Sequence, residues 1–201
     1  MVQQVVGAEL FHVTRALDYN THPPLTVGAT LDVGQQHNPF FAFFEQPRRY
    51  SVNVDGQEVW VPAMKFLSGV REGSITPNQL PFDAWQIANH FMLLSRELAF
   101  EQVRLKERSD APSRLTCLWC ADTLEGARYW ANRLGGNATI VKLSATGTIH
   151  RVNAALLMGD SEPYSETIRK ASEYWQGYGG DEGEPEVLFA GTAKVVSLSP
   201  S

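Results

Sequence analysis

Glu184-Pro185-Glu186-Val187-Leu188-Phe189 introduces the last strand of the chain, which the apolar pattern predicts from Val187 to Val196. Side chains two residues apart in a strand share a face, so the carboxylates of Glu184 and Glu186 are expected to point into one cleft. Pro185 cannot donate a hydrogen bond to a neighbouring strand and fits a strand start or an edge. Taken alone, however, the motif is better explained as two solvated acids at the edge of a sheet.

The elements before this strand predict a mixed α+β fold. Strands are expected around residues 9–15, 114–120 and 139–143, and helices over residues 81–106, 122–135 and 166–175. Residues 50–54 and 57–61 alternate around Asp55-Gly56, a pattern typical of a β-hairpin with a tight turn. We therefore expect one domain over residues 1–201, with this hairpin inserted around residues 50–62. Residues 25–34 show no periodic pattern and are expected to be irregular.

Two of the predicted helices and one predicted loop carry more specific sequence signals. Asp122-Thr123-Leu124-Glu125 matches a capping box, with Asp122 in the capping position, and Gly135-Gly136 is expected to end the same helix. Residues 177–184 form an acidic, glycine-rich loop, and we expect such a loop to carry specificity for a binding partner or substrate. The helix over residues 81–106 should bury one apolar face, made of Trp85, Ala88, Met92, Ala99 and Val103.

Composition sets the broad class of the protein. The chain has 201 residues, of which 43% are hydrophobic and 19% charged, which is consistent with a sizeable folded core and not with disorder. No apolar run approaches the roughly 20 residues that cross a bilayer, and the start lacks the features of a signal peptide. We therefore expect a cytoplasmic protein without a membrane partner. The net charge of -5 argues against a stable complex with nucleic acid.

Cys117 and Cys120 form a single Cys-x-x-Cys, which is compatible with a redox pair or with half of a zinc site. The five histidines are scattered, and side chains three residues apart in a strand point to opposite faces. The favoured interpretation is therefore two small core residues in a reducing compartment, with no metal site.

Three ordered segments resemble the ADP-ribosyltransferase superfamily. They are Phe11-His12-Val13-Thr14 on an early strand, the stretch from Cys117 to Trp130, and Glu184-Pro185-Glu186-Val187-Leu188. The chain also looks like an uncharacterised bacterial family within or beside this superfamily, with Pro-Ser-Arg at residues 112–114. Two features depart from the superfamily pattern: a His in the first segment does not normally accompany Glu-x-Glu, and no clear Ser-Thr-Ser is present.

The resemblance implies a fold with central split antiparallel sheets and flanking helices, and a site for NAD. Glu186 would stabilise the oxocarbenium-like transition state and hold the ribose 2′-hydroxyl, and Glu184 would orient or deprotonate the nucleophile. The NAD-binding residues implied are His12 beside the adenosine ribose, Val13 holding the nicotinamide amide through its backbone, Thr14, Arg15, Ser113, Arg114 and Trp119.

Some of these assignments stay open. Either Trp119 or Trp130 can offer a face for nicotinamide, although Trp130 fits core packing better. Either Arg15 or Arg114 can pair with the pyrophosphate, because a guanidinium matches phosphate in a forked geometry. No Gly-x-Gly-x-x-Gly is present, which argues against a Rossmann dehydrogenase.

The function implied is mono-ADP-ribosyl transfer from NAD to a protein or nucleic-acid acceptor, with release of nicotinamide. The resemblance suggests a toxin, an effector or a defence enzyme that is cytoplasmic or delivered into a target cell by a non-classical route. An inhibitor or antitoxin would then be a further partner. The alternative is a catalytically inactive binding module with the same fold.

Overall fold

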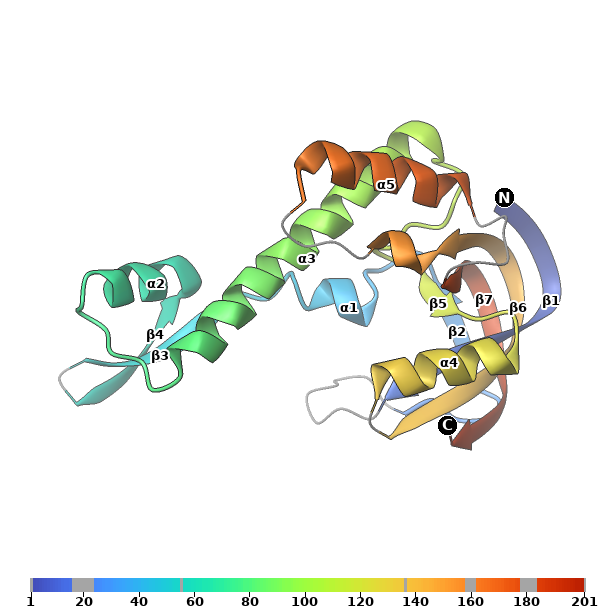
Figure 1. The fold of residues 1–201 in the computed structure, drawn as a ribbon. Helices are drawn as coiled ribbons and strands as arrows, with labels where there is room; N and C mark the ends of the chain where they lie inside the picture. The colour runs from blue at the N-terminus through green and yellow to red at the C-terminus, as the bar shows by residue number, and fades with distance from the viewer. Residues whose placement is uncertain are drawn as a thin grey trace. The chain divides into compact units, whose positions relative to one another are not determined.

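The computed structural model describes residues 2–15, 24–54, 56–135, 137–157, 162–177 and 184–200. The chain divides into two compact units, one formed by Met1–Asn38 with Glu97–Ser201 and the other by Pro39–Arg96. Figure 1 labels the elements, which are β1 (Val2–Arg15), β2 (Thr30–Val33), α1 (Pro39–Ala42), β3 (Arg49–Val54), β4 (Gln57–Pro62), α2 (Ala63–Arg71), α3 (Leu80–Glu107), β5 (Leu118–Cys120), α4 (Leu124–Leu134), β6 (Ala138–Asn153), the 3-10 helix η1 (Ala154–Leu157), α5 (Tyr164–Gln176) and β7 (Pro185–Pro200).

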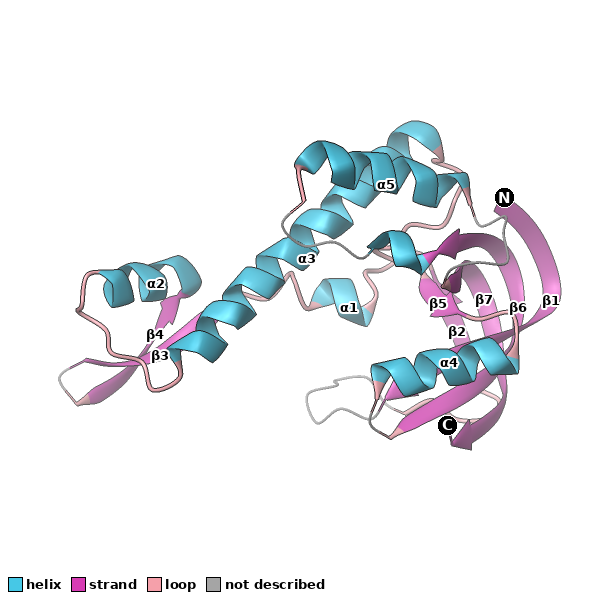
Figure 2. Cartoon of the chain, in the orientation of Figure 1, coloured by secondary structure: helices cyan, strands magenta, loops and turns pink. Residues whose placement is uncertain are grey.

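The first unit is built on an antiparallel sheet. Among the described residues this sheet has five strands in the order β1-β6-β7-β2, and β5 pairs with β7 off this path. The longest pairing joins β6 to β7, from Thr139 opposite Pro200 to Asn153 opposite Pro185. With the helices drawn in Figure 2, this sheet confirms the predicted mixed α+β class.

The short strand β5 links the late strand to the first one. Trp119 of β5 lies opposite Leu188 of β7. Ala121, directly after β5, exchanges two backbone hydrogen bonds of 2.9 and 2.7 Å with Phe11 of β1. The strands β1, β6, β7 and β5 therefore form a closed path, and α4 contacts β1 and β6 beside it (Figure 1).

A pair of facing glycines lets β6 and β7 approach closely. Gly147 and Gly191 lie opposite each other, with φ angles of 151° and 143°. A Cβ atom at Gly147 would lie 2.3 Å from the carbonyl oxygen of Ala190, and one at Gly191 would lie 2.4 Å from that of Thr146. Only glycine satisfies both this backbone conformation and this spacing.

The second unit contains the predicted hairpin, which the pairing of β3 with β4 confirms, from Arg49 opposite Pro62 to Val54 opposite Gln57. Tyr50 and Phe66 stack with ring centroids 5.1 Å apart, and Ile87 of α3 packs into the same core. The insertion is longer than the predicted hairpin, because residues 39–96 form this unit together.

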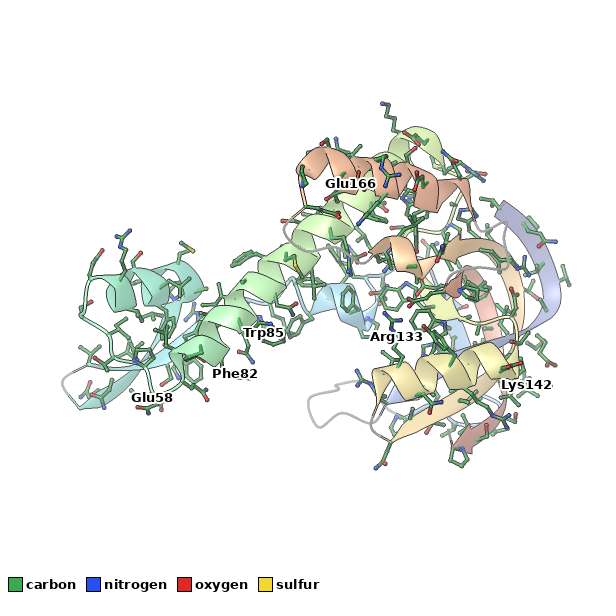
Figure 3. The ribbon with its side chains drawn as sticks, viewed as in Figure 1. Glu58, Phe82, Trp85, Arg133, Lys142 and Glu166 are labelled. Carbon is green, nitrogen blue, oxygen red and sulfur yellow. The ribbon has the colours of Figure 1, made fainter. Side chains whose placement is uncertain are left out.

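The predicted helix over residues 81–106 is confirmed as α3, but its buried face differs from the predicted one. Ala99 and Val103 are buried, whereas Ala88 and Met92 are exposed. Trp85 is 61% exposed, and it is labelled beside Phe82 in Figure 3. The stripe that is buried instead consists of Ile87, His90, Glu97, Phe100 and Arg104. An apolar pattern misses this stripe because part of it is charged and is buried by ion pairing.

Three other local predictions are corrected. The N-cap of α4 is Thr123, whose hydroxyl accepts from the backbone N–H of Gly126 at 3.0 Å, because Asp122 pairs with Arg151 instead. The strand predicted from residue 114 begins only at Leu118, since residues 113–117 form a turn with hydrogen bonds back to the carbonyl of Ser113. Residues 30–33, expected to be irregular, form β2 by pairing with β7.

The predicted α5 helix and the ending of α4 at Gly135 are confirmed. Asp55 of the predicted hairpin turn, Gly136, and residues 178–183 of the predicted acidic loop lie outside the described residues. No helix in the described part of the chain has both the length and the apolar character needed to cross a membrane.

Candidate functional site

A pocket forms where β1, β5, β7 and α4 meet. Its volume is about 150 Å³. Apolar cavities of about this size hold a single benzene ring. The lining residues are Phe11, His12, Val13, Trp119, Cys120, Ala121, Trp130, Leu134 and Glu186. Most of the wall is aromatic or aliphatic, and the ionisable side chains His12 and Glu186 come from opposite ends of the sequence.

His12 is held by the strand beside it. Its Nδ1 lies 2.8 Å from the carbonyl oxygen of Trp119. A carbonyl only accepts, so Nδ1 carries the proton and donates, which leaves Nε2 as an acceptor. Burial lowers the pKa of His12 below its ordinary value of 6.5, although the hydrogen bond to the Trp119 backbone acts in the opposite direction. The ring is therefore neutral at pH 7.

Glu186 lies on β7, and its side chain is 11% exposed. Its Oε2 accepts from Nη1 of Arg114 at 2.9 Å and from the hydroxyl of Tyr174 at 3.1 Å. Both hydrogen bonds that described residues make to this carboxylate therefore end on the same oxygen. One oxygen is anchored to the protein interior, and the other remains for a group in the pocket.

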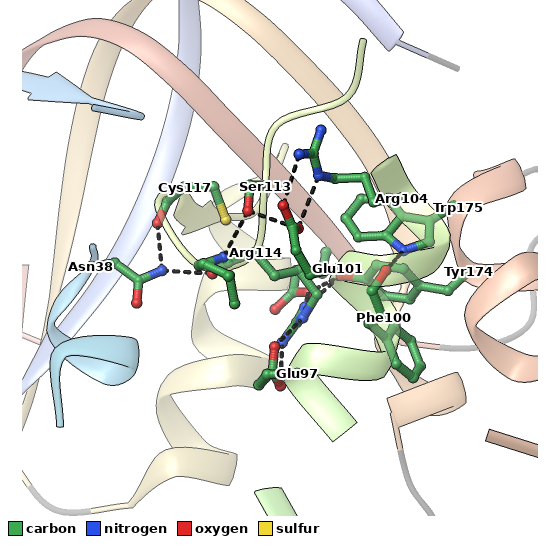
Figure 4. Close-up of polar contacts among 12 residues, drawn as sticks. Asn38, Glu97, Phe100, Glu101, Arg104, Ser113, Arg114, Cys117, Tyr174 and Trp175 are labelled. Carbon is green, nitrogen blue, oxygen red and sulfur yellow. Dashed lines mark hydrogen bonds and ion pairs between the residues drawn. The ribbon is translucent and has the colours of Figure 1, made fainter. Parts of the chain in front are cut away.

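Arg114, the partner of Glu186, has a side chain that is only 4% exposed. Figure 4 labels it beside Glu97. Its Nε and Nη2 lie 2.9 and 3.4 Å from the two carboxylate oxygens of Glu97 on α3. Burial opposes the charge of Arg114, but attraction to Glu97, Tyr174 and Glu186 raises its pKa well above the usual value. Arg114 is therefore a permanent cation between two acids.

Ser113, next to Arg114, also faces α3. Its hydroxyl donates to Glu101 at 2.8 Å, and Glu101 forms a two-pronged pair with Arg104, at 2.9 and 2.7 Å (Figure 4). Ser113 and Arg114, predicted to bind NAD, are thus directed at carboxylates of α3 and are not part of the pocket wall.

Glu184 lies in a different environment from Glu186. It precedes β7 and pairs with Arg133 of α4, which Figure 3 labels, and with the hydroxyl of Tyr129 at 3.0 Å. Its backbone is fixed by Asn153, whose side-chain oxygen accepts from the Glu184 N–H at 3.0 Å. The prediction that both acids point into one cleft is therefore wrong for this pocket, which only Glu186 lines.

The remaining predicted residues divide between the pocket and its surroundings. Val13 and Trp119 line the pocket, whereas Thr14 and Arg15 follow on β1 without lining it. Arg15 donates to the carbonyl of Leu134 at 2.7 Å, which places its guanidinium at the end of α4. Trp130, for which core packing seemed the better fit, is part of the pocket wall and donates from Nε1 to the carbonyl of Pro185 at 3.0 Å.

Sequence reasoning missed Glu97 and Tyr174. Both are buried polar residues at positions that face the interior on α3 and α5. The available signal for Glu97 was its place on the stripe that continues to Phe100 and Arg104, but its partner Arg114 belongs to a turn that no periodicity marks. Nothing in the sequence distinguishes Tyr174 from an aromatic residue that only packs in the core.

Cys117 and Cys120 are both buried with free thiols, as the favoured interpretation predicted. They belong to different core clusters, and burial raises the pKa of each thiol. Among the described residues no group of three or more His, Cys, Asp or Glu side chains is arranged to hold a metal ion.

No curated protein matches this chain in sequence. The profile of a family described as "Protein of unknown function (DUF2441)" matches residues 10–199. Because this match covers most of the chain, the protein belongs to the DUF2441 family.

Proposed function

We propose that the protein is a mono-ADP-ribosyltransferase that cleaves NAD and transfers ADP-ribose to a protein or nucleic-acid acceptor. The observation that carries the proposal is the placement of Glu186 in an aromatic pocket beside a neutral His12. The finer description of the fold, an ADP-ribosyltransferase-like split sheet, is part of the same proposal. So are the cytoplasmic or delivered location and an inhibitor or antitoxin partner.

The pocket suits the nicotinamide ring of NAD. This ring is flat and positively charged, and the faces of tryptophan side chains such as Trp119 and Trp130 attract cations. A neutral His12 does not repel the ring. The negative charge of Glu186 favours a cation in front of it.

Glu186 supplies the electrostatic part of the reaction. The bond between the ribose carbon and the nicotinamide nitrogen breaks, and its electron pair stays on the nitrogen, which becomes neutral. Positive charge then develops on the ribose, as in glycoside hydrolysis. The pocket-facing oxygen of Glu186 stabilises this charge and accepts from the ribose 2′-hydroxyl.

The acceptor completes the transfer. Its nucleophilic atom bonds to the ribose carbon and loses a proton, which Glu184 can accept. Glu184 is paired with Arg133 and Tyr129, so the acceptor has to compete with these two side chains. Arg15, beside Leu134 of the pocket wall, is then the better placed of the two candidate arginines to bind the pyrophosphate, because Arg114 is enclosed by acids.

The test is nicotinamide release from NAD by the purified chain, measured with water alone, with a guanidine compound and with cell protein as acceptors. We expect turnover by the wild type and a loss of about 10²- to 10³-fold in Glu186→Gln, which removes a fixed charge and keeps the shape. Glu9→Gln is the matched control, because Glu9 is an exposed acid on β1 paired with Lys142. Equal turnover by Glu186→Gln would refute the assigned role.

A binding module of the same fold remains the alternative outcome. Calorimetry with NAD separates the two: NAD binding without nicotinamide release under any acceptor condition would favour the module. Absence of both binding and release would remove NAD from the proposal altogether.

A further inference from the structure

The buried ion pair between Arg114 and Glu97 needs a reason beyond stability. Their side chains are 4% and 1% exposed. Taking two charges out of water costs free energy that their attraction repays only in part, and apolar residues of similar volume often stabilise a protein as well or better. In this pair the cation also reaches a third charged residue, and that residue, Glu186, lines the pocket.

The contacts of Arg114 fix the orientation of its guanidinium group. Glu97 binds Nε and Nη2, and this two-pronged contact sets the plane of the guanidinium. With the plane set, Nη1 points at Oε2 of Glu186. Tyr174 makes the third contact, since its hydroxyl accepts from Nη1 at 2.5 Å and donates to the same Oε2.

This arrangement holds a carboxylate in one orientation before any ligand arrives. A side chain of glutamate has several rotatable bonds, and its freedom is lost only when neighbouring groups fix it. Here two donors grip one oxygen, so the other oxygen keeps a constant position relative to Trp119 and His12 in the pocket. A displacement of about 1 Å in such a group can cost about 100-fold in rate.

We infer that Glu97, Arg114 and Tyr174 are positioning residues that hold Glu186 in a single orientation. The inference rests on the proposed function for its catalytic consequence. It assigns Arg114 to the carboxylate and not to the pyrophosphate of NAD.

A second buried pair provides a matched control. Arg104 and Glu101 lie on the same helix, with side chains 10% and 14% exposed, and they too form a two-pronged contact. The third guanidinium nitrogen of Arg104, Nη1, donates to backbone carbonyls and lies 2.9 Å from the carbonyl oxygen of Ala111. This pair therefore has the same local architecture without a contact to Glu186.

The kinetic test uses Arg114→Lys, Glu97→Gln and Tyr174→Phe, with Arg104→Lys as the control. Lysine keeps the charge but not the planar fork. We expect Arg114→Lys and Glu97→Gln to lower the kcat of nicotinamide release by about 10- to 100-fold while the calorimetric Kd for NAD changes by less than about 3-fold. Wild-type kcat in Arg114→Lys, or an equal loss in Arg104→Lys, would overturn the inference.

A second measurement does not depend on turnover. In high-resolution crystal structures we expect one orientation of the Glu186 side chain in the wild type, with Oε2 on Arg114, and two or more orientations in Arg114→Lys. A single unchanged orientation in the variant would overturn the inference even if NAD proves not to be the substrate. If Glu186→Gln and the wild type release nicotinamide equally, the proposed function fails, and the crystallographic result still decides whether Arg114 positions Glu186.

Discussion

Replacing Arg114 by methionine should destabilise the protein through the acids that it leaves behind. Methionine fills a similar volume, but Glu97 and Glu186 would both lose the cation that they share. Glu97 is 1% exposed and cannot be solvated in place. Removing one partner of a buried ion pair typically costs about 3–5 kcal/mol. That is a large part of the roughly 5–15 kcal/mol by which a domain is stable.

The control variant Arg104→Met, on α3, should lose less free energy of unfolding than Arg114→Met. In Arg104→Met the remaining acid is Glu101, which is 14% exposed and keeps its hydrogen bond from the Ser113 hydroxyl. We expect a loss of about 1–3 kcal/mol, the range for a hydrogen-bonded charged group that loses one partner. The difference in free energy of unfolding between Arg114→Met and Arg104→Met therefore measures the cost of the second acid and of complete burial.

The double variant Arg114→Met/Glu97→Gln isolates the interaction. Removing the Glu97 charge relieves the destabilisation, so the double variant should be more stable than the sum of the single losses predicts by about 1–3 kcal/mol. The assay is urea unfolding at pH 7, followed by tryptophan fluorescence and circular dichroism. Additive losses within about 0.5 kcal/mol, or a loss below about 1 kcal/mol in Arg114→Met, would refute the reasoning.

Three further predictions follow from the same structure. The pKa of His12 is lowered by burial, so its contribution to stability is complete above its ordinary value of 6.5 and is lost as pH falls below it; His12→Gln should reduce the difference in urea midpoint between pH 7.5 and pH 5.5. Cys117 and Cys120 should not react with a disulfide reagent at pH 8 in the folded protein, and both should react in urea, because burial raises the pKa of each thiol. Gly147→Ala should cost at least about 1–3 kcal/mol in urea unfolding, since its Cβ would collide with the carbonyl of Ala190.

Periodicity predicted the elements of this fold better than it predicted their packing. The hairpin, α3, α4 and α5 were found because turn residues, caps and apolar spacing are local signals. The strand β2 was missed although Thr30-Leu31-Asp32-Val33 alternates polar and apolar residues, because four residues are the shortest length at which such a pattern indicates a strand. The buried face of α3 was misassigned because a charged residue is counted as exposed unless its partner is known, and the partner of Glu97 lies in a turn.

The candidate site shows the same division. Four pocket residues were selected from sequence segments: His12, Val13, Trp119 and Glu186. Two pairings bring them together, that of β5 with β7 and that of Ala121 with Phe11 of β1. Glu97 and Tyr174 could not be selected in this way. Their roles depend on the direction of the Arg114 side chain, which the turn over residues 113–117 sets.

Glu184 and Glu186 have different environments for a structural reason. Alternation of side chains applies within a strand, and β7 begins at Pro185, so Glu184 lies outside the pleat that directs Glu186. Glu186 is gripped from the interior by Arg114 and Tyr174, whereas Glu184 is paired at the surface with Arg133, which is 33% exposed. Interior groups hold Glu186 in place, whereas Glu184, with a side chain 18% exposed, is held by a partner that reaches the surface. In the proposed function, the Glu-x-Glu motif therefore supplies one carboxylate held by interior groups for the developing charge and one held near the surface for the acceptor.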